Sequence, residues 1–469
     1  MERLVLRRPR TNTSMTEADA PRCQRRFPKP TTTHTPLIQR IAKSYELEFP
    51  SHQKTTEPIG DAAQSKSTRH ALSRGNEDHS LSSTPAATTM NRIPDETYDE
   101  YSRTFHMVLL DPSYQVYTSP TGRGSAVYKI ENETMVIVGD LMCAKDDLGP
   151  LLEEIENFRH PTRLKLAFMG VGPWFVQYAE TKGWDHIEFG SERVVNPMHN
   201  AVLEKQASKR MLAQCQHLLH PKQGLTMGFY APSISGINSH LEHQLAQLYA
   251  DWRDTKGAKQ SGDAQAFITA YDLFSYRRRT AFLYMSDAEG EIAGMAMLRQ
   301  LGAEPGFYID PCIASASAPK GVTELLMVSS MRLLRRAEVS HLSLGVEPLA
   351  DLAARGLLAR AARSLYKMFT DAASVAGKKA YNDKFRPDPV LESSLYVVFP
   401  RADRKKKGLL PSFPFREAWA IMQVAHLQAD DGLKRTACPQ HQRVPAANYL
   451  AREEREGVPR RVWDKALVV

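Results

Sequence analysis

Three short segments between Lys320 and Pro387 constrain the fold of this chain more than any other feature. Their sequences are Lys-Gly-Val-Thr-Glu-Leu-Leu-Met at 320–327, Ser-Leu-Gly-Val-Glu-Pro-Leu at 343–349 and Lys-Lys-Ala-Tyr-Asn-Asp-Lys-Phe-Arg-Pro at 378–387. In this order they predict a loop entering a helix, a strand ending on glycine, another helix, and a basic turn before a last strand. Alternating strands and helices favour an α/β fold with helices packed on a sheet.

The chain before this region repeats the same plan. Hydrophobic patterns predict strands and helices in the order β-β-β-α-β-α-β from about Met107 to Phe189. A cationic helix is expected at 200–220, and a second α/β half follows it, including a helix over Ala361–Ala376. We therefore expect five parts: a disordered tail at 1–95, a first domain at 96–200, basic connecting helices at 201–262, a second, catalytic domain at 263–400 and a basic extension at 401–469.

The composition favours a polyanionic partner without requiring one. The chain has 469 residues, and 61 Lys and Arg against 53 Asp and Glu give a net charge of +8. Such a charge suits nucleic acid or an anionic membrane, but many soluble proteins are also mildly basic. No apolar run reaches the roughly 20 residues of a membrane span, so a lipid substrate would be reached from the water side.

Cysteine usage indicates a reducing compartment. The five cysteines are odd in number and scattered, which argues against a disulfide framework. Cys438 and His441 form a lone Cys-x-x-His without a second ligand pair, so we expect no metal site.

Both ends of the chain are polar. The segment 1–95 is rich in Ser, Thr, Pro and Arg, which is typical of disorder. Its Arg-rich start resembles a mitochondrial presequence, but prolines interrupt it and favour a flexible basic tail. The basic run at 401–407 followed by Trp419 would suit anionic lipid or RNA, or a solvated tail helix.

Carboxylates near two predicted element ends are candidates for chemistry. Asp310 ends a strand, where it would accept a proton or hold an amine, or simply form a turn before Pro311. Glu324 lies in the first helical turn, where it would contact substrate or favour the helix dipole. Lys320 precedes that helix and would suit a phosphate, or the loop is a plain helix cap. The Gly-rich pattern expected for coenzyme A is missing from this loop.

A basic turn supplies the positive charge that acyl transfer needs. Lys384, next to Tyr381, would stabilise an oxyanion or a leaving oxygen. Other cations and one aromatic ring are candidates for phosphate or substrate contacts, although a solvated basic surface would also explain them: Lys378, Lys379, Arg386, and Tyr276 beside Arg277–Arg279.

These motifs resemble the C-terminal catalytic part of the phosphatidylglycerol lysyltransferases, which move an amino acid from tRNA onto a lipid. The resemblance covers about 100–400 and rests on Tyr308-Ile-Asp310, on Lys384, and on Phe189-Gly-Ser-Glu192 followed by Lys205–Arg210. It implies two acetyltransferase-like (GNAT) domains joined by a basic helix. It also implies Asp310 and Lys384 in catalysis or substrate binding. From its place beside Lys384 we expect Tyr381 to join them as a catalytic residue, and we expect four residues to contact substrate: Tyr276, Glu324, Lys320 and Arg386. Five cations would contact tRNA: Lys205, Lys209, Arg210, Lys378 and Lys379.

One departure from the family pattern bears on the lipid. The family usually continues after the aspartate as Leu-Met-Arg-Arg, where this chain has Pro311-Cys312-Ile313-Ala314. The lost arginine and the missing multi-span segment resemble the free-standing fungal members, which attach glycine to the 3-hydroxyl of ergosterol. The expected protein is then a cytoplasmic, peripherally membrane-associated transferase that uses aminoacyl-tRNA and no other cofactor. The alternatives are an aminoacyl-phosphatidylglycerol synthase, a coenzyme A-dependent N-acyltransferase, and a non-catalytic RNA or membrane adaptor.

Overall fold

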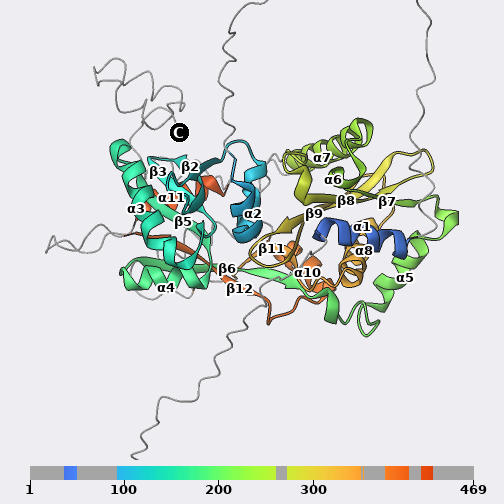
Figure 1. The fold of residues 1–469 in the computed structure, drawn as a ribbon. Helices are drawn as coiled ribbons and strands as arrows, with labels where there is room; N and C mark the ends of the chain where they lie inside the picture. The colour runs from blue at the N-terminus through green and yellow to red at the C-terminus, as the bar shows by residue number, and fades with distance from the viewer. Residues whose placement is uncertain are drawn as a thin grey trace, which may run out of the picture. The chain divides into compact units, whose positions relative to one another are not determined.

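The strands form one mixed sheet, drawn in Figure 1. The computed structural model describes residues 36–49, 92–259, 272–349, 352, 375–400 and 414–425. Apart from Pro36, all of them belong to the unit Leu37–Val469. The 12-stranded sheet has the order β1-β2-β3-β5-β12-β6-β11-β10-β9-β8-β7, and β4 pairs with β2. The strands are β1 (Gln115–Thr118), β2 (Gly124–Glu131), β3 (Thr134–Val138), β4 (Met142–Cys143), β5 (Lys165–Val171), β6 (Asp185–Val195), β7 (Thr226–Tyr230), β8 (Thr280–Ser286), β9 (Ile292–Leu301), β10 (Gly306–Ala314), β11 (Leu342–Pro348) and β12 (Ser393–Phe399).

Helices connect and flank the strands of this sheet. The α-helices of the described residues are α1 (Leu37–Glu48), α2 (Asp95–Tyr101), α3 (Leu148–Arg159), α4 (Pro173–Thr181), α5 (Lys209–Leu218), α6 (Pro232–Ser235), α7 (Ser239–Lys259), α8 (Val322–Arg336), α10 (Val375–Asn382) and α11 (Phe415–Val424). Short 3₁₀ helices include η2 (Thr104–Leu110), η7 (Arg277–Arg279) and η8 (Asp383–Phe385). The predicted α/β fold is confirmed.

The two halves follow one plan and exchange their last strands. In the first half, β3 leads through α3 to the parallel strand β5; in the second, β10 leads through α8 to the parallel strand β11. The strand that ends the first half, β6, pairs with β11 of the second half. The strand that ends the second half, β12, pairs with β5 of the first half, and β6 and β12 pair with each other. Each half therefore contributes a strand that pairs with a strand of the other half.

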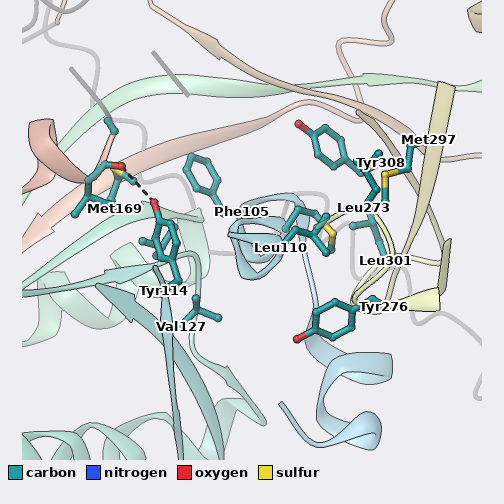
Figure 2. Close-up of a cluster of buried hydrophobic side chains, with 14 of the residues drawn as sticks. Phe105, Leu110, Tyr114, Val127, Met169, Leu273, Tyr276, Met297, Leu301 and Tyr308 are labelled. Atoms are coloured by element: carbon teal, nitrogen blue, oxygen red, sulfur yellow. Dashed lines mark hydrogen bonds between the residues drawn. The ribbon is translucent and has the colours of Figure 1, made fainter. Parts of the chain in front are cut away.

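Three apolar clusters form the core. One lies between the first half of the sheet and α3 and α4, and includes Phe168 and Phe175. Another packs α1, α5 and α8 on the second half. The third contains residues of both halves around η2, from Tyr114 and Met169 to Met297 and Tyr308 (Figure 2). The apolar residues of η2 thus join the two halves.

Helix α1 lies inside the segment 1–95, for which the sequence predicted disorder. Its buried residues Ile38, Ile41 and Tyr45 follow a helical spacing, and the helix contacts α8. The Tyr45 hydroxyl donates to the carbonyl of Met227 at 2.6 Å. The prediction was wrong at these residues because only three buried apolar side chains mark the helix in a polar sequence.

Three further predictions need correction. Asp310, which was expected to end a strand, lies inside β10, because this strand continues to Ala314. The cationic helix expected at 200–220 begins only at Lys209, and Lys205 lies in a turn with φ of 60°. The strand expected to end on Gly345 continues to Pro348, because Gly345, with φ of 88°, takes up a register shift against β6.

Several predictions concern residues outside the described ranges. These are most of the helix expected over Ala361–Ala376, the basic run at 401–407, and Cys23, Cys438 and His441. In the part of the chain that the structure covers, no helix is both long and apolar enough to cross a bilayer.

Candidate active site

The candidate site lies where two parallel strands separate. β10 pairs with β11 only at Phe307 and Tyr308, and its register against β9 shifts between Ile309 and Cys312. Asp310 and Cys312 therefore follow the last residue of β10 that pairs with β11. No residue of β11 pairs with Asp310 or Cys312 in the described structure.

Asp310 is held by an arginine of the neighbouring strand. Arg299 Nη2 lies 3.4 Å from Asp310 Oδ2, and the Arg299 side chain is only 2% exposed, against 36% for Asp310. The guanidinium also lies 4.9 Å from the centroid of the Tyr308 ring. The buried cation thus orients a carboxylate that keeps an exposed side.

Beside Asp310, a thiol and a phenol remain protonated. Burial, reinforced by the charges of Glu324 and Asp310, raises the pKa of Cys312 to about 12. The Cys312 thiol donates to the carbonyl of Thr323 at 3.6 Å. Burial also raises the pKa of Tyr381, and the neighbouring Cys312 adds to that effect. The Tyr381 hydroxyl is buried beside Cys312 and Thr323, and no hydrogen bond of standard geometry to it is found in the described structure.

An ion pair completes the constellation. Lys384 Nζ lies 2.9 Å from Glu324 Oε1 and 5.1 Å from the centroid of the Tyr381 ring. Thr323 Oγ1 donates to the other Glu324 oxygen at 3.0 Å. Burial acts to raise the pKa of Glu324, but the hydrogen bonds from Lys384 and Thr323 outweigh it and the pKa lies below its ordinary value. Glu324 is therefore ionised at neutral pH and holds the ammonium of Lys384 in place.

Helix α5 contacts both segments that carry the site. Ser208, at its N-terminus, donates to the carbonyl of Lys384 at 3.1 Å, and Gln214 donates to the carbonyl of Lys320 at 2.6 Å. The buried Asn200 donates to the carbonyl of Phe385 at 3.0 Å. Five predicted cations on these segments are exposed: Lys205, Lys209, Arg210, Lys320 and Arg386. The basic connection, which carries Lys205, Lys209 and Arg210, thus contacts the backbone of the segments that form the site.

The loop before α8 is occupied by a protein side chain. Gly321 has φ of 98°, and a Cβ at this position would lie 2.6 Å from Gln214 Nε2. The side chain of Gln214 therefore contacts the loop at Gly321, where a bound phosphate was one of the two interpretations of the sequence.

Tyr276 and Lys379 make contacts other than the predicted ones. Tyr276 is 9% exposed within the apolar cluster of Figure 2 and stacks on Tyr98 with 5.5 Å between ring centroids. Lys379 Nζ lies 2.9 Å from Glu347 and 3.5 Å from Asp383. The side chain of Lys378 lies outside the described part of the structure.

Two arginines near the site were missed by sequence reasoning. Arg299 lies near the end of β9, where Gln300 is the only other polar side chain, and a charge in such an apolar strand is a detectable signal of a buried charge. Arg193, on β6, contacts Asp383 next to Lys384 at 2.6 Å, and no local pattern indicates this contact.

Comparison with known proteins identifies the family. Residues 95–397 match the family model described as Phosphatidylglycerol lysyltransferase, C-terminal, which is more than half of the chain. The chain belongs to this family. A curated family relative, the phosphatidylglycerol lysyltransferase of Bacillus subtilis (strain 168), is 21% identical over 277 residues, which are 58% of this chain and 31% of the relative. The chain thus spans about a third of the length of that relative.

Solved structures support the fold of this family member. The structure of L-PGS from Bacillus licheniformis matches with a TM-score of 0.54 and 15% identity, over 66% of this chain and 90% of that one. A C-terminal DUF2156 domain from Agrobacterium fabrum matches with a TM-score of 0.52 and 18% identity, over 70% and 93%. At these identities the matches establish a shared fold.

Proposed function

We propose that this chain transfers an amino acid from aminoacyl-tRNA to the hydroxyl of a membrane lipid. Membership of the phosphatidylglycerol lysyltransferase family supports the reaction class. The observation that carries the proposal is the grouping of Lys384, Glu324 and Tyr381 beside Cys312, two residues beyond Asp310, where β10 and β11 separate. This grouping supplies a carboxylate, a fixed ammonium and a phenol donor, which are the groups that acyl transfer requires.

In the proposed reaction, the lipid oxygen attacks the ester carbonyl of aminoacyl-tRNA. The new C–O bond forms to the lipid, the C–O bond to the terminal ribose breaks, and the proton of the lipid hydroxyl ends on the ribose oxygen. Asp310 takes that proton or holds the α-amine of the amino acid. Lys384 and Tyr381 stabilise the negative charge that develops on the carbonyl oxygen.

We propose direct transfer, without an enzyme-bound thioester. Cys312 is the one thiol beside these groups in the described structure, and its pKa of about 12 leaves almost no thiolate at neutral pH. Because tRNA delivers the amino acid as an activated ester, the reaction needs no second activation step.

The basic connection supports tRNA as the donor. Lys205, Lys209 and Arg210 are exposed on the segment whose Ser208 contacts the backbone of Lys384. Phosphates bound there would bring the acceptor end of a tRNA towards the site. Lys378 and Lys379 stay candidates for the same partner, and Tyr276, Lys320 and Arg386 for substrate contacts.

For the acceptor and amino acid, we propose ergosterol and glycine. The residues Pro311-Cys312-Ile313-Ala314 replace a family segment that carries arginines, and Arg299 is already paired with Asp310. A neutral sterol hydroxyl does not need a further cation, whereas an anionic phosphatidylglycerol headgroup would favour one.

The test is a transfer assay with purified protein. tRNA charged with radiolabelled glycine or lysine is mixed with vesicles that contain either ergosterol or phosphatidylglycerol, and the lipids are analysed by mass spectrometry. A sterol carrying one glycine supports the whole proposal, and an aminoacylated glycerolipid supports the reaction class with the other acceptor. No product with any pair, together with unimpaired cellular function of an Asp310→Ala variant, would favour the adaptor. Binding of acetyl-coenzyme A by calorimetry would favour the N-acyltransferase.

A further inference from the structure

Arg193 of the first half contacts three carboxylates of the second half. It lies on β6 with a side chain that is 15% exposed, and each of its nitrogens lies close to a different carboxylate; the contact with Asp383 is a hydrogen bond, and the other two are ion pairs without hydrogen-bond geometry. The distances are 3.3 Å from Nε to Glu347, 2.6 Å from Nη2 to Asp383 and 3.1 Å from Nη1 to Glu392.

These contacts converge on the turn that carries Lys384. Asp383 begins η8 and directly precedes Lys384, Glu347 lies on β11, and Glu392 immediately precedes β12. Lys379 is a further cation in the group, at 2.9 Å from Glu347 and 3.5 Å from Asp383. One guanidinium thus links the last strand of the first half to both sides of the site-bearing turn.

We propose that Arg193 is a positioning residue for Lys384. This inference rests on the proposed function. The guanidinium fixes the carboxylate of Asp383 and thereby the orientation of η8, so that Lys384 points to Glu324 and the ring of Tyr381. The strand exchange makes this possible, because β6 lies beside β11 and β12 instead of pairing within its own half.

Charge balance gives the proposal a second reason. Without Arg193, the three carboxylates would share the ammonium of Lys379 as their one cation among the described side chains, close to the proposed catalytic cation Lys384. Burial raises the pKa of Glu392, and the nearby Glu347 charge adds to this effect while Arg193 opposes it. Removing the guanidinium would leave Asp383 free to compete with Glu324 for Lys384.

The test compares Arg193→Gln and Arg193→Lys with a matched control. Arg159→Gln is suitable because Arg159 has a similar exposure, 20%, and donates to both carboxylate oxygens of Glu156, at 2.6 Å and 2.7 Å, without contacting η8 in the described structure. All variants are assayed well below their melting temperatures. We expect Arg193→Gln to lower kcat by about 10²-fold, as misplacement of a catalytic group does, with KM for tRNA and lipid little changed. Arg193→Lys should recover part of the loss, and Arg159→Gln should lose stability but keep kcat.

A double-mutant cycle and an activity-independent measurement complete the test. Asp383→Asn should add little to the kcat loss of Arg193→Gln, because the two residues act through one contact. Hydrogen exchange should increase at 383–387 in Arg193→Gln and stay unchanged there in Arg159→Gln. Unchanged exchange at 383–387 in Arg193→Gln, or equal kcat losses in Arg193→Gln and Arg159→Gln, would overturn the positioning role. If the wild-type protein transfers no amino acid while exchange responds as expected, the proposed function fails and the structural link of Arg193 to the turn stands.

Discussion

The ammonium of Lys384 lies 2.9 Å from the carboxylate of Glu324, although the two residues are 60 positions apart in the chain. The pair joins the first turn of α8 to the η8 turn. A carboxylate at a helix N-terminus is favoured by the helix dipole, so Glu324 is ionised for two reasons. It therefore serves as a permanent counterion that orients Lys384 without removing its ability to donate further hydrogen bonds.

Replacing Lys384 by Met should abolish most turnover. Loss of one donor to a developing oxyanion typically lowers kcat by about 10²–10³-fold, and we expect that range with little change in KM for tRNA. Lys182→Met is the matched control, because Lys182 is exposed and lies 5.3 Å from the Tyr178 ring centroid, a similar cation–aromatic contact outside the site. Steady-state kinetics would contradict the assignment if both variants kept wild-type kcat.

Tyr381→Phe should separate catalysis from stability. The phenol makes no standard hydrogen bond in the described structure, so its loss should change the free energy of unfolding by less than about 1 kcal/mol. Loss of a donor to the oxyanion should still lower kcat by at least about 10-fold. Tyr128→Phe removes another buried phenol, in the first half, and should leave kcat unchanged. A Tyr381→Phe enzyme with normal kcat would exclude the phenol from the chemistry.

Cys312→Ala should leave transfer largely intact. A protonated thiol with a pKa of about 12 is a poor nucleophile, so removing it should lower kcat by less than about 10-fold, chiefly through a small packing defect. Single-turnover assays with radiolabelled aminoacyl-tRNA would reveal any protein-bound amino acid. Complete loss of activity, or trapping of label on wild-type protein but not on the variant, would instead indicate a thioester.

Reversing the charge of Lys205, Lys209 and Arg210 to Glu should weaken tRNA binding. Each lost phosphate contact should reduce the slope of log K against log salt by about 0.7–0.9. A triple reversal of the exposed first-half residues Lys145, Arg163 and Lys182 changes net charge equally and should leave the slope near its wild-type value. Filter binding across a salt series measures both. Equal slopes for the two triple variants would remove tRNA from this surface.

The stability of the fold should fall as pH drops below about 6.5. Burial lowers the pKa of His106 to about 4, and Nε2–H of its neutral ring donates to the carbonyl of Asp140 at 2.8 Å while Nδ1 accepts from the Arg103 amide at 2.8 Å. His106 binds a proton near pH 6.5 in the unfolded chain but only near pH 4 in the folded chain. The free energy of unfolding should therefore fall by roughly 3 kcal/mol as the pH drops across that window. Urea unfolding at pH 7 and pH 5 measures the loss, and His106→Gln should make it smaller. An unchanged pH dependence in the variant would show that other groups cause it.

The candidate site was only partly accessible to sequence reasoning. Asp310, Glu324 and Lys384 were named from separate local patterns: a strand end, a first helical turn and a basic turn. Each had an ordinary structural explanation, because one sequence does not reveal that these three segments meet. Arg299 and Arg193 were missed, since their roles depend on which strand lies beside which.

The sequence by itself determined the local structure of this protein. Short apolar runs bounded by turn residues specified β8–β10, and helical spacing specified α8. Together they determined an α/β class, because both patterns act over a few neighbouring residues. Only the tertiary structure decided that β6 and β12 exchange places and that Arg193 meets Asp383, 190 residues further along the chain. Strand pairing uses backbone hydrogen bonds that nearly every residue offers, so the partner of a strand is decided by how the whole sheet buries its side chains.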